Sequence, residues 1–212
     1  MPQPSRAALE PRKLPVQARS AASVDAILKA TIQVLLKAGK ERLTTTSVAM
    51  RAGVSVGTLY QYFPNKSSLL QAALRRHMDE VTEAVERVCL EQRGSPLAEM
   101  ATALIHSFLA AKMRDMKTSI ALYSVSSDVD GVRIVQQMAG RSNGAIAAML
   151  ASSCELITKD PQLVASILQG AMAGVSKRLL ESDAPEKQLA PLREELVLLA
   201  CAYLAACSSP TG

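Results

Sequence analysis

The sequence predicts an all-α protein of about nine helices, and three observations support this fold class. Of its 212 residues, 49% are hydrophobic and 20% are charged, which is enough apolar material for a sizeable core. Five of the ten prolines lie in the first 15 residues or the last three, so most of the chain is free to be helical. Apolar residues recur at helical spacing, and no stretch alternates as a half-buried strand would.

The first predicted helix follows a basic arm. Residues 1–22 are rich in Pro, Ala and Arg without helical periodicity, and we expect a flexible arm there. Ser23 is the expected N-cap of the helix, and an apolar stripe runs from Ile27 to Leu35. Gly39 is the expected C-terminal glycine.

Two short helices separated by a tight turn are expected next. Thr44 or Thr45 caps the first of them, and Gly53 supplies the positive φ that the turn needs. Ser55 is the expected cap of the second helix, which Pro64 stops because the residue before a proline avoids helical geometry.

The spacing of these short helices is that of a helix-turn-helix. Ala49 is small where the helices touch, Gly53 makes the turn, and Leu59 and Phe63 point inward from the second helix. Such a motif places its second helix in the DNA major groove. Sequence-specific DNA binding is therefore the leading hypothesis.

A long helix should follow, from about Lys66 to Leu90, with Asn65 as its cap. The RGSP run breaks it, and SSDVDG and SDAPEKQ are expected connectors further on. Five more helices are predicted, over about 96–113, 115–124, 131–154, 161–180 and 189–206.

The positive charge is concentrated at the front of the chain. Residues 1–70 hold 10 Lys+Arg and 3 Asp+Glu, a net +7, which leaves 14 and 16 for the rest, a net −2. A basic front suggests that this part meets a polyanion, although a solvated charged face would give the same count.

Several classes of protein are not supported. No nucleophile elbow, HExxH, phosphate loop or acidic and histidine cluster is present, so we expect neither an enzyme nor a metal or cofactor. The four cysteines have no CxxC spacing. No signal peptide, no apolar run of roughly 18 residues and no basic amphipathic helix appears, so a cytoplasmic protein that does not bind membranes is expected.

The run VSVGTLYQYFPNKSSLL (Val54 to Leu70) closely resembles the DNA-binding signature of the TetR family of transcriptional repressors. The resemblance is dense over about residues 23–75. It implies a homodimer that binds double-stranded DNA at a palindromic operator and releases it when a small molecule respaces the recognition helices. It also implies a DNA-binding domain over 23–67 and an effector-binding and dimerisation domain over 68–208.

The matching positions carry over as DNA contacts. Gln61 would read an adenine edge, and Val56 or the Thr58 methyl would meet a thymine methyl. Gly57 and Tyr62 would also face the groove, Gly57 because a helix pressed against DNA favours a residue without a side chain. The expected phosphate contacts are Thr45, Tyr60, Tyr62 and Lys66. A solvated Gln61 and a partly buried Tyr60 are the alternatives.

The arm admits two interpretations. Its cations would enter the adjacent minor groove, or the arm is a solubilising tail. These cations are Arg6, Arg12, Lys13 and Arg19.

The C-terminal domain, residues 68–208, is the part in which members of the family diverge. Frequent methionines indicate either an adaptable pocket or plain core, and His106 is a core histidine or a pocket group. Because Arg114, Arg133 and Arg141 fall at helix edges, we expect a largely apolar effector. The candidate ligand-binding residues are His106, Met113, Tyr123, Gln137 and Met138.

Dimerisation should use the last two long helices, about 161–180 and 189–206. The first has small residues that allow close approach, and the second is apolar nearly all round, so both are expected at a two-fold interface. The alternatives are a monomer core helix, and a dimeric DNA-binding protein without an effector. The sequence leaves repressor against activator open.

Overall fold

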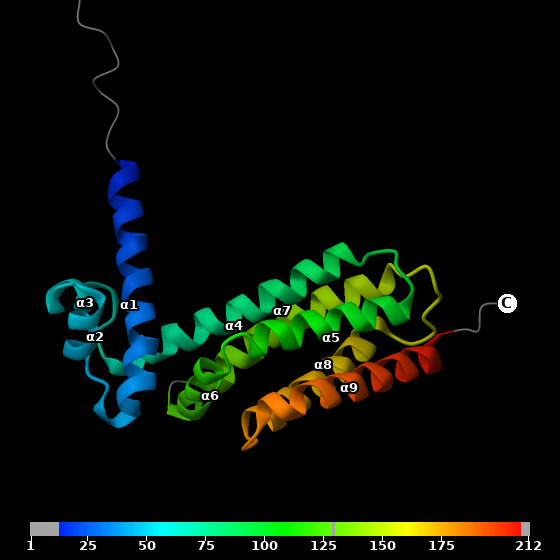
Figure 1. Ribbon diagram of the computed structural model, residues 1–212. Helices are drawn as coiled ribbons and strands as arrows, with labels where there is room; N and C mark the ends of the chain where they lie inside the picture. Colours follow the sequence, from blue (N-terminus) through cyan, green and yellow to red (C-terminus); the bar gives the residue numbers. More distant parts are fainter. Residues whose placement is uncertain (1–12, 129, 209–212) are drawn as a thin grey trace, which may run out of the picture. The chain divides into compact units, whose positions relative to one another are not determined.

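The computed structural model describes residues 13–128 and 130–208. Over these ranges it contains nine α-helices and one 3-10 turn, which confirms the predicted all-α fold (Figure 1). The elements are α1 (Lys13–Arg42), α2 (Thr45–Ala52), α3 (Val56–Tyr62), α4 (Lys66–Glu91), α5 (Leu97–Met113), α6 (Met116–Val125), η2 (Ser126–Asp128), α7 (Gly131–Ala151), α8 (Pro161–Leu180) and α9 (Pro185–Cys207).

The chain forms two compact units, residues 1–73 and 74–212. The division falls inside α4, six residues after the boundary at 67/68 that the sequence suggested. The first unit buries side chains from α1, α2, α3 and the start of α4, among them Ile27, Val48, Leu59 and Leu69, together with Leu43 between α1 and α2. Each unit therefore has its own core.

The first helix begins earlier than predicted. α1 starts at Lys13, ten residues before Ser23, so the expected arm is wrong for residues 13–22. Pro15 lies in the first turn, where its missing N–H removes no helical hydrogen bond, and alanines follow it. Gly39 has φ +75° and interrupts the helical geometry at the position where the sequence placed a helix end. Residues 1–12, with Arg6 and Arg12, lie outside the described residues.

The helix-turn-helix is fixed by local hydrogen bonds, as predicted. The Thr44 side chain accepts a hydrogen bond from the Ser47 N–H at 3.1 Å and Ser47 Oγ accepts one from the Thr44 N–H at 3.1 Å, which is a capping box. Gly53 takes the left-handed conformation, with φ 70° and ψ 28°. Ser55 Oγ caps α3 by accepting the Thr58 N–H at 2.9 Å.

The inner face and the end of α3 also match the prediction. Leu59 is fully buried and Phe63 is nearly so. Phe63 is extended, with φ −133°, before Pro64. Asn65 Oδ1 then caps α4 by accepting the Ser68 N–H at 2.8 Å. With its apolar side buried, α3 has one face left for other contacts.

The second unit is a helical bundle in which α5 packs on α9, and α8 packs on both α7 and α9. Two predicted bounds were wrong. α9 begins at Pro185, inside the expected connector, because proline suits the first helical position, and α7 ends at Ala151. In the described part of the chain, no helix has the length and apolar character needed to cross a bilayer.

Replacing Gly53 by Val should destabilise the first unit by about 1–2 kcal/mol, because a β-branched residue is strained at positive φ. A Cβ at Gly53 would meet no atom within 4 Å, so the cost is conformational and not steric. Gly53→Asn, which tolerates this conformation, is the matched control. Urea unfolding measures both variants, and equal stability of Gly53→Val and wild type would contradict the turn assignment.

Candidate nucleic-acid interface and ligand cavity

The outward face of α3 carries the residues that the sequence predicted to face DNA. Val56, Gly57 and Gln61 are exposed, and Tyr60 is 49% exposed, while Leu59 beneath them is fully buried. A rigid inner face thus supports an accessible outer one. Sequence reasoning missed the neighbouring exposed side chain of Met50 on α2. The exposure of Met50 could have been predicted from the sequence, because Met50 lies opposite the buried face of α2.

Two hydroxyl groups meet where α2 and α3 approach. Thr45 Oγ1 and Tyr60 OH lie 3.1 Å apart at the surface. Thr45 is also the first residue of α2, where backbone N–H groups have no helical acceptor. Such a pair of hydroxyls beside free N–H groups suits a phosphate oxygen.

Tyr62 and Lys66, also predicted to contact DNA, have partners inside the first unit. The Tyr62 hydroxyl donates to Ser20 Oγ at 3.0 Å. The Lys66 ammonium donates to the backbone carbonyl of Lys40, near the end of α1. Both side chains therefore fasten the region after the recognition helix to α1. A phosphate contact from Tyr62 would require its hydroxyl to give up Ser20, whereas Lys66 keeps further N–H donors.

Nothing inside the protein explains the glycine in α3. A Cβ at Gly57 would meet only Ser55 Oγ, at 3.7 Å, which is an ordinary contact. Glycine within a helix costs up to about 1 kcal/mol relative to alanine. The fold would thus accept alanine at this exposed position.

The second unit contains a partly open cavity of about 430 Å³, between α4, α5, α6, α7 and α8. Its lining is mostly apolar and includes Leu74, Val81, Val85, Phe108, Leu122, Val135, Ile146, Met172 and Leu180. Pockets for small molecules have roughly this size and character.

Only two of the five predicted ligand-binding residues, Tyr123 and Met138, line this cavity. His106 is exposed, so it is neither a core nor a pocket residue, because α5 turns Phe108 and not His106 toward the cavity. Met113 is buried in the core of the second unit. Gln137 faces outward and accepts a hydrogen bond from Arg75 at 3.1 Å.

Two polar side chains, Ser119 and His77, meet the backbone of Lys112 in the cavity wall. Ser119 Oγ donates to the Lys112 carbonyl at 2.7 Å and lies 3.0 Å from His77 Nε2. Because the hydroxyl has one proton, His77 Nε2–H is the donor to Ser119. Burial lowers the pKa of His77 to about 4, and the nearby Lys112 charge adds to this, so His77 is neutral near pH 7.

Lys112 is a charged cavity residue that sequence reasoning missed. It shares a face of α5 with Phe108, four residues earlier, and both line the cavity. Its ammonium donates to Met78 Sδ at 3.6 Å, and burial lowers the pKa of Lys112. In the sequence, only this helical phase indicates that Lys112 faces the cavity. The sequence analysis considered arginines, and not Lys112, as the cations that a ligand could meet.

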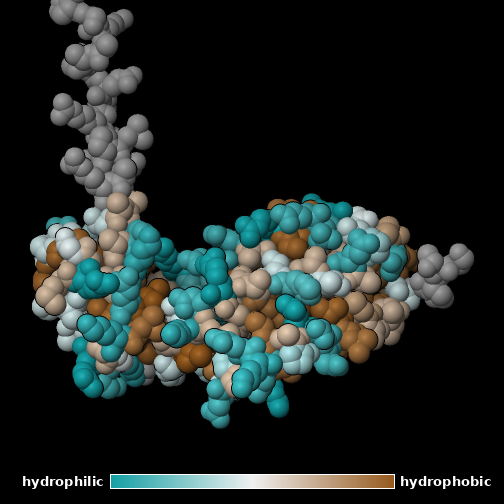
Figure 2. All heavy atoms as spheres, in the orientation of Figure 1, coloured by the Kyte–Doolittle hydropathy of each residue, from teal (hydrophilic) through white to brown (hydrophobic). Residues whose placement is uncertain are grey.

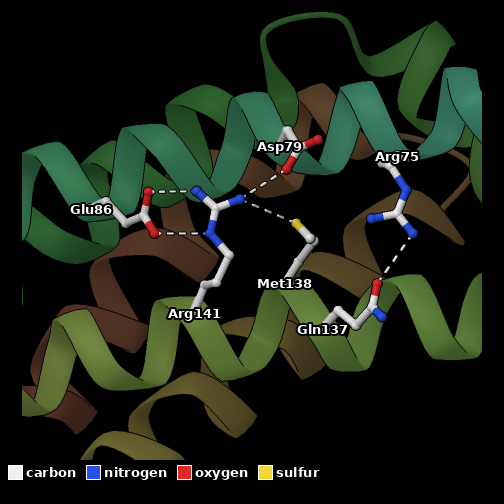
Figure 3. A network of polar contacts seen from close by, with 6 residues as sticks. All are labelled: Arg75, Asp79, Glu86, Gln137, Met138 and Arg141. Atoms are coloured by element: carbon white, nitrogen blue, oxygen red, sulfur yellow. Dashed lines mark hydrogen bonds and ion pairs between the residues drawn. The ribbon is translucent and has the colours of Figure 1, made fainter.

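An ion-pair network fastens α7 to α4 (Figure 3). The Arg141 guanidinium holds Glu86 with two hydrogen bonds, of 3.1 and 2.8 Å, and Asp79 with one of 2.9 Å. Arg75 of α4 and Gln137 of α7 add a further bond in the same view. The bidentate pair gives α4 a defined position against α7, although exposed pairs contribute only about 1 kcal/mol or less each.

The free energy of unfolding should fall as the pH is lowered, because His77 is protonated more easily in the unfolded chain than in the folded one. An unfolded histidine takes up a proton near pH 6.5, whereas folded His77 does so only near pH 4. The contribution of neutral His77 to the free energy of unfolding is thus full above about pH 6.5 and is lost as the pH falls toward 4. Between about pH 7.5 and about pH 5, this free energy should fall by about 2 kcal/mol through His77. His77→Gln keeps a donor for Ser119 but does not titrate. In urea unfolding at both pH values, wild type should lose that much more stability than His77→Gln. Parallel losses would contradict the burial of a neutral His77.

Two family models match the chain. Residues 27–73 match the bacterial regulatory proteins of the tetR family, and residues 96–204 match the tetracyclin repressor-like C-terminal domain. The first is the helix-turn-helix unit, and the second covers most of the helices around the cavity.

Curated relatives agree with this but share only part of their length. The transcriptional repressor KstR of Mycolicibacterium smegmatis is 44% identical over 30% of this chain and 31% of its own. KstR of Rhodococcus jostii is 34% identical over 50% of this chain and 52% of its own length. The regulator BetI of Paraburkholderia phymatum is 27% identical over 53% and 58%. The chain thus spans about a third to just over half of the length of these relatives.

Solved structures extend the likeness to nearly the whole fold. A TetR-family regulator from Mesorhizobium loti has a TM-score of 0.73 at 19% identity, covering 90% of this chain and 99% of that one. One from Shewanella has a TM-score of 0.62 at 26% identity, covering 88% and 98%. The C-terminal family model spans half of the sequence. The N-terminal family model confirms the signature at Val54 to Leu70. The chain therefore belongs to the TetR family of bacterial regulatory proteins.

Proposed function

We propose that the protein is a sequence-specific DNA-binding transcriptional regulator, a repressor that a small molecule releases from a palindromic operator. The observation that carries this is the outward face of α3, which has an exposed glycine and glutamine on a well-packed helix-turn-helix. The relatives KstR, a transcriptional repressor, and BetI, a transcriptional regulator, support the same role.

The exposed side chains of α3 are of types that recognise base edges in the major groove. The Gln61 amide would form two hydrogen bonds with an adenine, and Val56 or the Thr58 methyl would contact a thymine methyl. Thr45 and Tyr60 would hold phosphates through their paired hydroxyls. In this proposal Tyr62 and Lys66 chiefly position α3, because each already donates a hydrogen bond to a residue of α1.

A homodimer through α8 and α9 is supported by the apolar surface of these two helices. They pack on each other, and each exposes large side chains to solvent: Leu163, Ile167, Leu198 and Leu199 are between 49% and 63% exposed. Figure 2 shows hydrophobic residues at the surface of the second unit, between hydrophilic ones. Apolar groups of this kind on a helix pair favour a two-fold interface, which in turn implies a palindromic site.

The cavity favours an effector-responsive protein over one whose second unit only dimerises. A domain that served dimerisation alone would have no need to leave about 430 Å³ unfilled between five helices, since native interiors are close-packed.

Gly57→Ala should have opposite effects on folding and on DNA binding. The variant should be more stable by up to about 1 kcal/mol, since alanine favours the helix and meets only Ser55 Oγ. It should bind the operator less tightly, because the methyl group holds the helix away from the groove. Urea unfolding and fluorescence anisotropy measure the two effects. Undiminished DNA affinity would remove Gly57 from the interface.

Selection of bound duplexes from random DNA tests the proposal as a whole. Wild type should recover one palindrome, and Gln61→Ala should relax the preference at one position of each half-site, at a cost of about 1–3 kcal/mol per half-site. Gln33→Ala, an exposed glutamine on α1, is the matched control and should select the same palindrome. Recovery of no consensus, with binding that fades steeply with salt, would mean that only phosphates are contacted and would contradict sequence-specific regulation.

A further inference from the structure

The charged groups of the cavity lining are unbalanced. Among the residues that the structure describes, two lysines line it, Lys112 and Lys177, and no aspartate or glutamate does. Lys177 is largely exposed, and its ammonium lies 4.0 Å from Glu181, so its charge is partly balanced at the surface. Lys112 is the remaining positive charge, and it extends from the same face of α5 as Phe108.

Lys112 lacks an anionic partner inside the protein. Among the described residues, no carboxylate lies within 4.0 Å of its ammonium, and its acceptor is the Met78 thioether, which is a weak one. The nearest acidic residue along the chain, Asp115, uses its carboxylate to cap α6, accepting the Thr118 N–H at 3.0 Å and hydroxyl at 2.6 Å. Burying a charge without a partner is costly, and burial lowers the pKa of Lys112 accordingly.

The groups beside Lys112 are polar but neutral. His77 is uncharged near pH 7 and donates to Ser119, whose own proton goes to the Lys112 carbonyl. The rest of the wall is mostly apolar, with the largely exposed Lys177 and with uncharged polar side chains such as Gln136, Ser142 and Gln169. The cavity therefore offers one cation without an anionic partner beside a polar group, and hydrocarbon over most of the remaining wall.

We propose that the cavity binds an amphipathic monoanion, whose carboxylate-type head group pairs with the Lys112 ammonium and whose apolar body fills the remaining space. This rests on the proposed function in taking the cavity as the effector site, and it assigns the chemical class of the effector. The head group would replace the Met78 thioether with a charge-assisted hydrogen bond. The largely apolar effector expected from the sequence thus gains a defined negative end.

Three probes with the same alkyl chain test the head group: decanoate, decanol and decyltrimethylammonium. Binding is measured by isothermal titration calorimetry on the full chain, with each probe below its aggregation concentration. Decanoate should bind about tenfold or more tightly than decanol, because only decanoate forms a charged hydrogen bond. The cationic probe should bind more weakly than decanol.

Three variants locate the effect. Lys112→Met keeps the aliphatic stem and removes the charge, so it should weaken decanoate binding by about tenfold or more and leave decanol binding unchanged. Lys112→Arg should keep the preference for decanoate. Lys117→Met, on the exposed side of α6, is the matched control and should behave like wild type. Thermal unfolding shows that each variant is folded, and Lys112→Met should be at least as stable as wild type because it removes a buried unpaired charge.

Equal affinities for decanoate and decanol would overturn the inference, and so would decanoate binding that Lys112→Met does not weaken. Either result would leave an effector cavity and DNA reading by α3 in place. Failure of the proposed function has a different signature: a selection experiment without a palindrome, whatever the cavity binds.

Discussion

The apolar side of α4 is buried along its length, and most of the structure depends on this one helix. Leu69, Leu70 and Ala73 lie in the core of the first unit, whereas Val81 and Val85 lie in the second. Since α4 runs from Lys66 to Glu91, the same helix follows α3 in the chain and lines the cavity with residues between Leu74 and Val85. Its start is fixed by the Asn65 cap and by the bond from Lys66 to the Lys40 carbonyl.

Under the proposed function, α4 is the element that the cavity and the DNA-binding unit share. Leu74, His77 and Met78 of α4 line the cavity within about three and a half turns of the helix start. A head group bound to Lys112 would displace the Met78 thioether and so change what α4 contacts. Arg141 holds the outer side of α4 through Glu86 and Asp79 (Figure 3). We infer that ligand and operator compete through the position of α4, which is a coupling of two sites by one shared element.

The features that sequence reasoning predicted are those that local rules determine. The Thr44 cap, the left-handed Gly53, the Ser55 cap and the extended residue before Pro64 each depend on a few adjacent residues. The burial of Leu59 follows from helical phase within a short motif. Fold class and helix-turn-helix were therefore readable without coordinates.

The features that were missed depend on residues distant in the sequence. The partners of Tyr62 and Lys66 lie 42 and 26 residues away, so neither bond has a local signature. His106 and Gln137 were one or two residues out of phase with the cavity, an error that a mostly apolar helix hides. Lys112 resembled an ordinary helix-end lysine, because its lack of an acidic partner is a property of the packed bundle.

The most direct test of the account is the affinity for the selected duplex, measured by fluorescence anisotropy as decanoate is added. We expect saturating decanoate to weaken DNA binding by about fivefold or more, and saturating DNA to weaken decanoate binding by the same factor. Lys112→Met should keep its DNA affinity at the same decanoate concentration. DNA affinity that stays constant while calorimetry shows the cavity filled would contradict a coupling between cavity and recognition helix.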